Sequence, residues 1–521
     1  MRAILVLFAA SQLWATNTYY ISKSTGSDSY TSTQAQSKST PWAHFRGMAS
    51  CSSNCASYTP VAGDTFVLMG GDTWVNSDFP ILWKWSGTAG SRITIGVDPT
   101  WYTGAAWARP IFDAQKATIN GGAVVGNVMF QAGPYLSSAT SYVTLDSIEM
   151  KGLYSPDKGS SGKLSYIQCN TNPCHYWTFN NIYIHGWSVA TDGHCVLVLL
   201  PGPLGVGDAF TNGIIDGSDR TDAIPYTGSD TYHSGATGTC SALFHLPDRV
   251  TGNVIHDVPN AIVGEIQVAG PAGLEIGSNL IYNIIKTNNP AETHENAIET
   301  TDVHGGTYYI HDNVIHDIFY GESMMLGNSN ETDYVWNNVI YNMSQTWPPS
   351  WPQNNGFTNM AVYAWNNTIV PAAATQCFTL SGYAGKFTSV TIQNNHCIST
   401  SATIAPASWN GTAATIDHNS LMTPTDTASF GYTSSQTFAY SPISGSVPTV
   451  RVGINLSSNC SGSLASICSG TGYACAYDAK SKSVICPARM PPVARPASGA
   501  WDIGAYVGAL QPPTSLQVTV R

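Results

Sequence analysis

The sequence contains little charge. Only 10% of its 521 residues are Asp, Glu, Lys or Arg, and the formal net charge is −11. Such a low charge excludes a typical cytosolic helical protein, and the shortage of basic residues excludes a face that meets nucleic-acid phosphates. The apolar share of 43% and the aromatic share of 11% exclude an intrinsically disordered chain.

Helical periodicity and long apolar runs are also missing. After the N-terminus no stretch is long and apolar enough to cross a bilayer as a helix, so we expect no membrane span in the mature chain. Polarity comes instead from Ser, Thr and Asn, together with 48 Gly. This composition suits β-structure with many turns.

The first residues, "MRAILVLFAASQLWA", have the pattern of a secretory signal. Arg2 gives a positive start, residues 3–10 give a short apolar core, and small residues precede a cut after Ala15. We therefore expect residues 1–15 to be a signal peptide and the protein to be secreted or held at the cell surface. A buried first strand is the alternative.

The cysteine count supports export. An even number of Cys in an exported chain indicates disulfides, here each closing a local loop, whereas the spacing of a zinc site is lacking. The pairing itself is left open by the sequence. The twelve Cys fall into six neighbouring couples: Cys51 and Cys55, Cys169 and Cys174, Cys195 and Cys240, Cys377 and Cys397, Cys460 and Cys468, Cys475 and Cys486.

A short apolar word with a central Asn recurs along the chain, for example in "VTGNVIHDV", "YYIHDNVIHDI" and "YVWNNVIYNM". The steps run from 24 residues (395 to 419) to 40 residues (213 to 253), a range typical of solenoids and propellers. The aligned positions are Asn181, Gly213, Asn253, Asn279, Asn313, Asn338, Asn367, Asn395 and Asn419.

Each repeat predicts a coil of short strands. After each Asn the residues alternate with period two, as in a strand with one side buried. Further strands are indicated by "NAIVGEI", "ENAIETT", "GESMMLG" and "TQCFTLSG". Stacked coils bury the apolar side that one coil cannot bury alone, so we predict an all-β parallel β-helix. The Asn then sits inside a turn and hydrogen-bonds to the Asn of the next coil. A propeller is the minor alternative, since it needs four strands per repeat.

Segments at both ends carry a resemblance to a known group of proteins. "NTYYISKSTGSDS", "TPWAHFRGM" and "VAGDTFVLMGG", with its turn at Gly63-Asp64-Thr65, resemble the start of secreted right-handed parallel β-helix proteins of the pectate-lyase-like superfamily, bacterial type. "WDIGAYVGA" resembles the closing strand of many bacterial members. The resemblance implies the fold with N- and C-terminal caps, and it leaves the function open among lyases, hydrolases, epimerases and non-catalytic proteins.

The predicted organisation follows the repeats. After the signal peptide we expect an N-terminal cap with the first coils, the β-helix repeats, C-terminal coils with a Cys-rich cap, and a tail. The corresponding ranges are 1–15, 16–150, 151–425, 426–510 and 511–521.

The densest cluster of candidate catalytic residues is "AETHENAIETTDVHGG". Period two puts Glu295 and Glu299 on one side of a strand, and the next coil offers Glu322. Adjacent coils are roughly 4.8 Å apart, so these carboxylates could share a metal ion or a proton.

Two enzymatic functions fit these residues. A polysaccharide lyase would use Ca²⁺ held by Glu295, Glu299 and Glu322, with Arg249, Lys286 or His294 as the base. A glycoside hydrolase would use two carboxylates, from the same glutamates or from Asp192 with Asp222. The resemblance favours the lyase. Aromatic residues that could stack on sugars are Trp347, Trp351, Tyr320 and Tyr226.

A non-catalytic extracellular protein with a structural, adhesive or matrix role is the rival hypothesis. The wealth of Thr, Ser, Asn and Tyr fits it, and self-association would then occur through the caps. His256, His311 and His316 fall inside the repeated strand word, so we interpret them as structural. The expected partner under the enzymatic hypotheses is a polysaccharide, with no role for nucleic acid.

Overall fold

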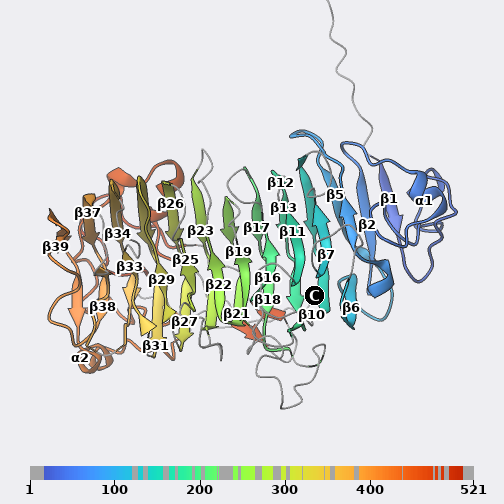
Figure 1. The fold of residues 1–521 in the computed structure, drawn as a ribbon. Coiled ribbons are helices and arrows are strands. Elements are labelled where there is room, and N and C mark those ends of the chain that lie inside the picture. Colours follow the sequence, from blue (N-terminus) through green and yellow to red (C-terminus); the bar gives the residue numbers. More distant parts are fainter. Residues whose placement is uncertain are drawn as a thin grey trace, which may run out of the picture.

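A computed structural model of the protein shows short strands stacked in coils along one axis, from the blue N-terminal end to the orange end (Figure 1). It describes residues 17–119, 127–132, 139–155, 164–169, 174–189, 194–200, 206–219, 221, 239–244, 248–264, 273–284, 295–300, 305–319, 321–344, 346–351, 358–372, 374–380, 386–436, 438–472, 476–478, 483–485 and 492–508.

The strands form three long parallel sheets. Sheet 1 contains β1 (Thr18–Ile21), β2 (Thr65–Gly70), β5 (Ile93–Tyr102), β9 (Val143–Asp146), β13 (Thr178–Asn180), β17 (Ala209–Thr211), β20 (Arg249–Thr251), β23 (Leu274–Gly277), β26 (Gly306–His311), β30 (Glu331–Trp336), β34 (Met360–Trp365), β37 (Phe387–Gln393) and β41 (Thr415–Asp417). Sheet 2 contains β3 (Thr73–Trp74), β6 (Ile111–Ala117), β10 (Glu149–Ser155), β14 (Tyr183–His185), β18 (Ile214–Asp216), β21 (Val254–Val258), β24 (Leu280–Ile284), β27 (Val314–Ile318), β31 (Val339–Met343), β35 (Thr368–Ile369), β38 (His396–Ile398) and β42 (Ser420–Met422), with β15 (Ser188–Val189) beside β10.

Sheet 3 closes the coil. It contains β4 (Ile81–Trp83), β7 (Asn127–Ala132), β11 (Leu164–Cys169), β16 (His194–Leu199), β19 (Thr239–Phe244), β22 (Asn260–Val263), β25 (Ile298–Glu299), β29 (Met324–Met325), β33 (Ser350–Trp351) and β36 (Thr379–Leu380). Smaller parallel pairs are β8 (Thr140–Ser141) with β12 (Cys174–His175), and β28 (Gly321–Glu322) with β32 (Thr346–Trp347). Antiparallel pairs are β39 (Ser408–Trp409) with β40 (Thr412–Ala413), and β43 (Ala476–Asp478) with β44 (Ser483–Ile485).

Helices are short and lie outside the coils. They are α1 (Ser53–Ser57), α2 (Pro424–Ser429), η1 (Gln34–Gln36), η2 (Asn76–Asp78), η4 (Ser457–Asn459) and η5 (Gly462–Cys468). Among the described residues, no helix has the length and hydropathy that a membrane crossing requires. The predicted all-β parallel β-helix is therefore confirmed, while the boundaries proposed between caps, coils and tail stay predictions.

Alternation along the strands builds one continuous core. In β26, Tyr308 and Ile310 point inward and are buried, whereas Tyr309 between them is partly exposed. Because each strand is in register with its neighbours, inward residues stack on inward residues from coil to coil. The apolar core consequently runs from Tyr19 to Trp409.

The predicted asparagine ladder is confirmed. From Asn253 to Asn419, each side-chain Nδ2 donates to the Oδ1 of the Asn one coil on, at 2.9–3.0 Å. Each backbone N–H donates to the same oxygen at 2.8–3.1 Å. The ladder satisfies backbone groups at the turn between sheets 1 and 2, which burial would otherwise leave without partners.

The alignment of Asn181 with this ladder is wrong by one residue. Asn181 has φ +53°, the left-handed conformation that Asn212 adopts in the next coil at φ +54°. The ladder position is therefore occupied by Ile182, which is buried, and then by Gly213, whose N–H donates to Asn253 Oδ1 at 2.7 Å. Asn tolerates the left-handed region better than most residues, so a turn Asn and a ladder Asn look alike in sequence.

Four local disulfides clamp the molecule, as the cysteine spacing predicts. They join Cys51 to Cys55, Cys169 to Cys174, Cys377 to Cys397, and Cys460 to Cys468. The side chains of the other four Cys (Cys195, Cys240, Cys475 and Cys486) lie outside the described residues. Because disulfides persist in oxidising compartments, these bonds support the expectation of export.

The C-terminal segment turns back along the side of the coils. We call residues 452–472 and 492–508 the C-terminal arm. Its residues Leu456, Ile467 and Trp501 pack on Trp336 and Trp365, which lie on the outer face of sheet 1. The arm therefore covers part of a face that the coils alone would expose.

Candidate active-site groove

The outer face of sheet 1 carries two straight rows of side chains, because its strands are in register. The first row passes from Thr178 through Ala209, Arg249, Glu275, Tyr309 and Tyr334 to Tyr363. The second row passes from Asn180 through Thr211, Thr251, Gly277, His311 and Trp336 to Trp365. Each row advances by one strand spacing, roughly 4.8 Å, per coil.

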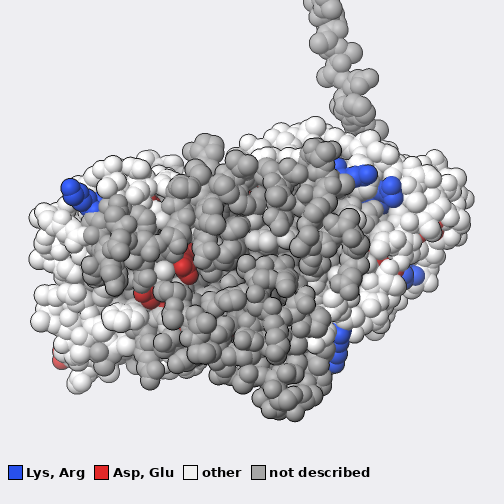
Figure 2. Space-filling view, viewed as in Figure 1, with Lys and Arg blue, Asp and Glu red and all other residues white. Residues whose placement is uncertain are grey.

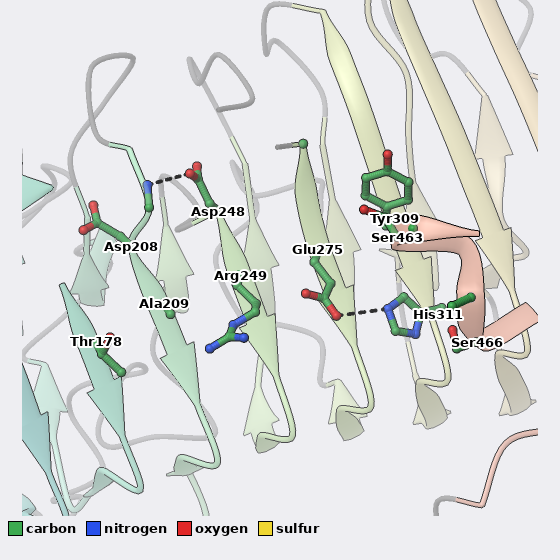
Figure 3. Close-up of a pocket in the computed structure, with 14 residues that line it drawn as sticks. Thr178, Asp208, Ala209, Asp248, Arg249, Glu275, Tyr309, His311, Ser463 and Ser466 are labelled. Atoms are coloured by element: carbon green, nitrogen blue, oxygen red, sulfur yellow. Dashed lines mark hydrogen bonds and ion pairs between the residues drawn. The ribbon is translucent and has the colours of Figure 1, made fainter. Parts of the chain in front are cut away.

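A groove with a volume of about 550 Å³ lies on this face, between β13 and the C-terminal arm. Its floor comes from consecutive coils, and Gly462, Ser463, Ala465 and Ser466 of the arm form its wall at one end (Figure 3). Polar floor residues are Thr178, Asp208, Asp248, Arg249, Glu275, Tyr309 and His311.

Two aspartates precede neighbouring strands of the floor. Asp208 accepts a hydrogen bond from the Trp177 N–H at 2.7 Å and is only 3% exposed. Asp248, one coil on, accepts from the Gly207 N–H at 2.6 Å (Figure 3). Burial raises the pKa of Asp208 well above its usual range, and the nearby Asp248 carboxylate adds to the effect. The surroundings of the Asp208 carboxyl therefore favour its neutral form, although the Trp177 N–H and the Arg92 charge oppose this shift.

The pKa of Glu275 is shifted in the opposite direction, downward. Its Oε1 lies 3.3 Å from His311 Nε2, and its side chain is 39% exposed. The hydrogen bond to His311 lowers the pKa of Glu275, and the positive charges of His311 and Arg249 lower it further. Glu275 is therefore ionised.

His311 is held in a fixed position on the floor. Burial opposes its charged form, but hydrogen bonds to Asp312 and Glu275 outweigh burial and raise the pKa of His311 to about 9. Its ring stacks on Trp336 with 4.4 Å between ring centroids. On the other side a Cβ at position 277 would lie 2.7 Å from the ring, so Gly277 is what leaves room for it.

The predicted glutamates lie elsewhere. Glu299 belongs to sheet 3, where its Oε2 accepts from Asn296 Nδ2 at 2.8 Å, and Glu322 accepts from the Ser350 hydroxyl at 2.8 Å. Glu295 is fully buried, and the other two are 7% exposed. Ca²⁺ takes six to eight oxygen ligands. Within the described ranges, no group of three or more His, Cys, Asp or Glu is placed to hold a metal ion, and the calcium site with Glu295, Glu299 and Glu322 stays a prediction.

Trp351 does not present a ring to a sugar, and that prediction is wrong. Its side chain is fully buried against Phe378 and Trp409, and its Nε1 donates to Asp333 Oδ2 at 2.7 Å inside the coil. Trp347, by contrast, is 61% exposed. It lies on β32, opposite Glu322 of β28, and is absent from the groove lining. Its role as a stacking platform stays a prediction.

Of the remaining predicted site residues, one lies in the groove and the others lie outside the described residues. Arg249, expected as a base, lies in the groove floor between Ala209 and Glu275, and its side chain is exposed. The others, Lys286, His294, Tyr226, Tyr320, Asp192 and Asp222, lie outside the described residues. Few Lys, Arg, Asp or Glu side chains appear among the described residues on the face seen in Figure 2.

Most groove residues were missed from the sequence, although a signal for them exists. Counting back four positions from the ladder gives Arg249, Glu275 and Tyr309, and counting back five gives Asp208 and Asp248. Aligning the coils on the ladder residue therefore collects the groove floor. His311, interpreted as structural, stands two positions before the ladder.

Comparisons with solved structures return proteins of similar architecture. Pectate lyase Pel9A has 14% identity and a TM-score of 0.42, with 94% of this chain and 96% of that chain covered. A rhamnogalacturonan lyase has 14% identity and a TM-score of 0.35, with 79% and 88% covered. The GH136 lacto-N-biosidase from Eubacterium ramulus has 10% identity and a TM-score of 0.35, with 78% and 68% covered.

Sequence comparisons give no such relatives. No protein-family model matches the chain, and no curated protein matches it.

Proposed function

We propose that the protein is a carbohydrate-active enzyme that hydrolyses a polysaccharide lying along the groove of sheet 1. The observation that carries the proposal is one groove with two carboxyl groups whose pKa values are shifted in opposite directions, raised at Asp208 and lowered at Glu275. Pairs of acids whose surroundings push their pKa values apart are how glycosidases divide acid and base work.

Asp208 is the general acid and Glu275 the general base. As the bond between the anomeric carbon and the glycosidic oxygen breaks, Asp208 gives its proton to that oxygen. Glu275 takes a proton from the water that attacks the anomeric carbon, so that one water is consumed per bond. Proton exchange with solvent then returns Asp208 to its acid form and Glu275 to its base form. Two strand spacings, roughly 10 Å, separate the backbones of their coils, which leaves room for this water.

Arg249 and Tyr309 hold the sugar. The Arg249 guanidinium stands between the coils of Asp208 and Glu275 and can bind a hydroxyl or carboxylate of the substrate. Tyr309, one coil beyond Glu275, offers a ring for stacking.

The second candidate is β-elimination from a uronate-containing polysaccharide. It is favoured by two cations in the same groove, Arg249 and protonated His311, because a lyase must neutralise a uronate carboxylate before the neighbouring proton leaves. Assistance by Ca²⁺, predicted from the sequence, belongs to this candidate.

A panel of polysaccharides, assayed with Ca²⁺ and with a chelator, separates the candidates. New reducing ends without unsaturated uronide absorbance support the hydrolase, and NMR of the first product then reports inversion or retention. Unsaturated product overturns hydrolysis in favour of elimination, and its loss with the chelator indicates a metal-dependent lyase. Silence across a broad panel overturns both, and a non-catalytic structural or adhesive role then takes their place.

A further inference from the structure

The groove has a wall that does not come from the coils. The C-terminal arm crosses the outer face of sheet 1 beside Tyr309 and His311, and η5 contributes Ser463 and Ser466 to the lining (Figure 3). Beyond the arm's edge the two rows of the face continue as Tyr334, Trp336, Tyr363 and Trp365.

Those aromatic rings are the natural continuation of a sugar-binding surface, yet the arm occupies it. Trp336 is fully buried and Trp365 is 4% exposed, since both pack against Leu456, Ile467 and Trp501 of the arm. The Tyr309, Tyr334 and Tyr363 rings stack in series, with centroids 5.7 and 4.9 Å apart. A polysaccharide continuing in this direction would have to displace the arm.

The arm is fixed to the coils by polar contacts. Trp336 Nε1 donates to Ser466 Oγ at 3.0 Å, and Asn337 Nδ2 donates to Ser469 O at 2.8 Å. Asn394 holds Ile454 through two hydrogen bonds of 2.8 Å, one to its N–H and one to its carbonyl.

Two further features rigidify the arm itself. The buried Arg495 guanidinium donates to the carbonyls of Asp502 and Gly504 at 2.9 and 2.8 Å. The disulfide between Cys460 and Cys468 closes the loop that holds η5. The wall of the groove is therefore a cross-linked, anchored structure.

We propose that this wall makes the site specific for a chain end: the polysaccharide enters from the β13 side, its terminus abuts η5, and cleavage releases short units. The inference rests on the proposed hydrolysis. Between the Asp208–Glu275 pair, centred at β20, and β26 beside the wall lie two strand spacings, roughly 10 Å. That length holds a mono- or disaccharide unit, which is the expected product.

The test compares the native protein with a variant whose wall is loosened, on a polysaccharide that the panel identifies as a substrate. Viscosity and reducing ends are followed together, and a chemically end-blocked oligosaccharide serves as a second substrate. The native protein should release short products with little loss of viscosity and should leave the end-blocked substrate intact. Early collapse of viscosity, or cleavage of the blocked substrate, overturns the inference and leaves hydrolysis standing.

The loosened variant is Cys460→Ser combined with Cys468→Ser. Its loss of viscosity per reducing end should rise severalfold, and the end-blocked substrate should become cleavable. The matched control is Cys51→Ser with Cys55→Ser, which removes a local disulfide at the other end of the molecule and should leave the product pattern unchanged. A folded arm variant with the native product pattern contradicts the role of the wall. Absence of any product from the native protein contradicts the proposed function itself.

Discussion

The outer face of sheet 1 has two halves built on the same backbone. From Thr178 to Glu275 both rows are small, polar or charged, and the first row lines an open groove. From Tyr334 to Trp365 they are aromatic and lie under the C-terminal arm. Because strand spacing and register are alike in both halves, the difference comes from the side chains and from what covers them. A solenoid supplies a periodic surface, and function depends on where that surface is left uncovered.

The turn between sheets 1 and 2 repeats the contrast. Just before the ladder, two coils under the open groove place Gly252 and Ser278 in the left-handed conformation, and three coils of the other half place Asn337, Asn366 and Asn394 there. Asn337 and Asn394 use their amides to dock the arm. In the doublets Asn337-Asn338 and Asn394-Asn395, one Asn therefore serves the ladder and the other holds the arm.

The largest effect is expected from Asp208→Asn, which removes the proposed general acid from the open half. The amide keeps an acceptor for the Trp177 N–H but has no acidic proton, so kcat should fall by about 10²–10⁴-fold with KM little changed. Initial rates of reducing-end release measure this. Thr251→Ala, on the same face but outside the groove lining, is the control and should retain full activity. Full activity in Asp208→Asn would remove Asp208 from the mechanism.

Asn338→Ala, beneath the covered half, should lower the free energy of unfolding without removing a catalytic group. Its amide bonds with Asn313, Ile310 and Asn367 would be lost, which leaves several buried groups without partners. We expect a loss of about 3–5 kcal/mol, measured by chemical denaturation.

The matched control for the ladder is Asn419→Ala at its last rung. Asn419 is half-buried, so solvent can replace part of what is lost, and about 1 kcal/mol is expected. Equal losses for the two variants would mean that burial does not determine how much each ladder Asn contributes to the free energy of unfolding.

The fold was predictable because it depends on a repeated local pattern. Strand alternation and recurring Asn words predict stacked coils, and the ladder confirms the reason for the Asn. The error at Asn181 arose because a left-handed turn residue and a ladder residue share the same preference for Asn. Only the register of the strands distinguishes them.

The site was much less predictable, for a physical reason. The stretch around Glu295 and Glu299 is dense in charge, yet density along the chain does not tell which side chains the next coil buries. The groove combines single residues from consecutive coils, such as Asp208, Arg249 and Glu275. The arm adds residues more than 180 positions away, a contact that no local pattern encodes.

At the boundary between the two halves, His311→Gln should change the pH dependence of stability. A raised pKa means that the folded protein holds the His311 proton more tightly than the unfolded chain does. Its stabilising effect is therefore complete below about pH 6.5 and is lost as the pH rises to about 9. Unfolding followed from pH 6 to 9.5 should show a loss of roughly 3 kcal/mol in the native protein and a flatter profile in the variant.

The exposed His418 provides the control for this profile. Its side chain is 42% exposed and pairs with Asp417, so His418→Gln should leave the native pH profile in place. The same slope in His311→Gln as in the native protein would show that groups other than His311 set it.

The smallest effect is expected outside both halves, at Trp347. Its exposed ring lies on β32, away from the groove, so Trp347→Ala should change the free energy of unfolding by no more than about 0.5 kcal/mol and leave kcat and KM unaltered. Tyr309→Ala, inside the groove, should raise KM by about three- to tenfold because a stacking platform is lost. A matching rise in KM for Trp347→Ala would mean that the glycan runs beyond sheet 1 and around the coil. The uncovered part of sheet 1 would then be only one portion of a longer binding surface.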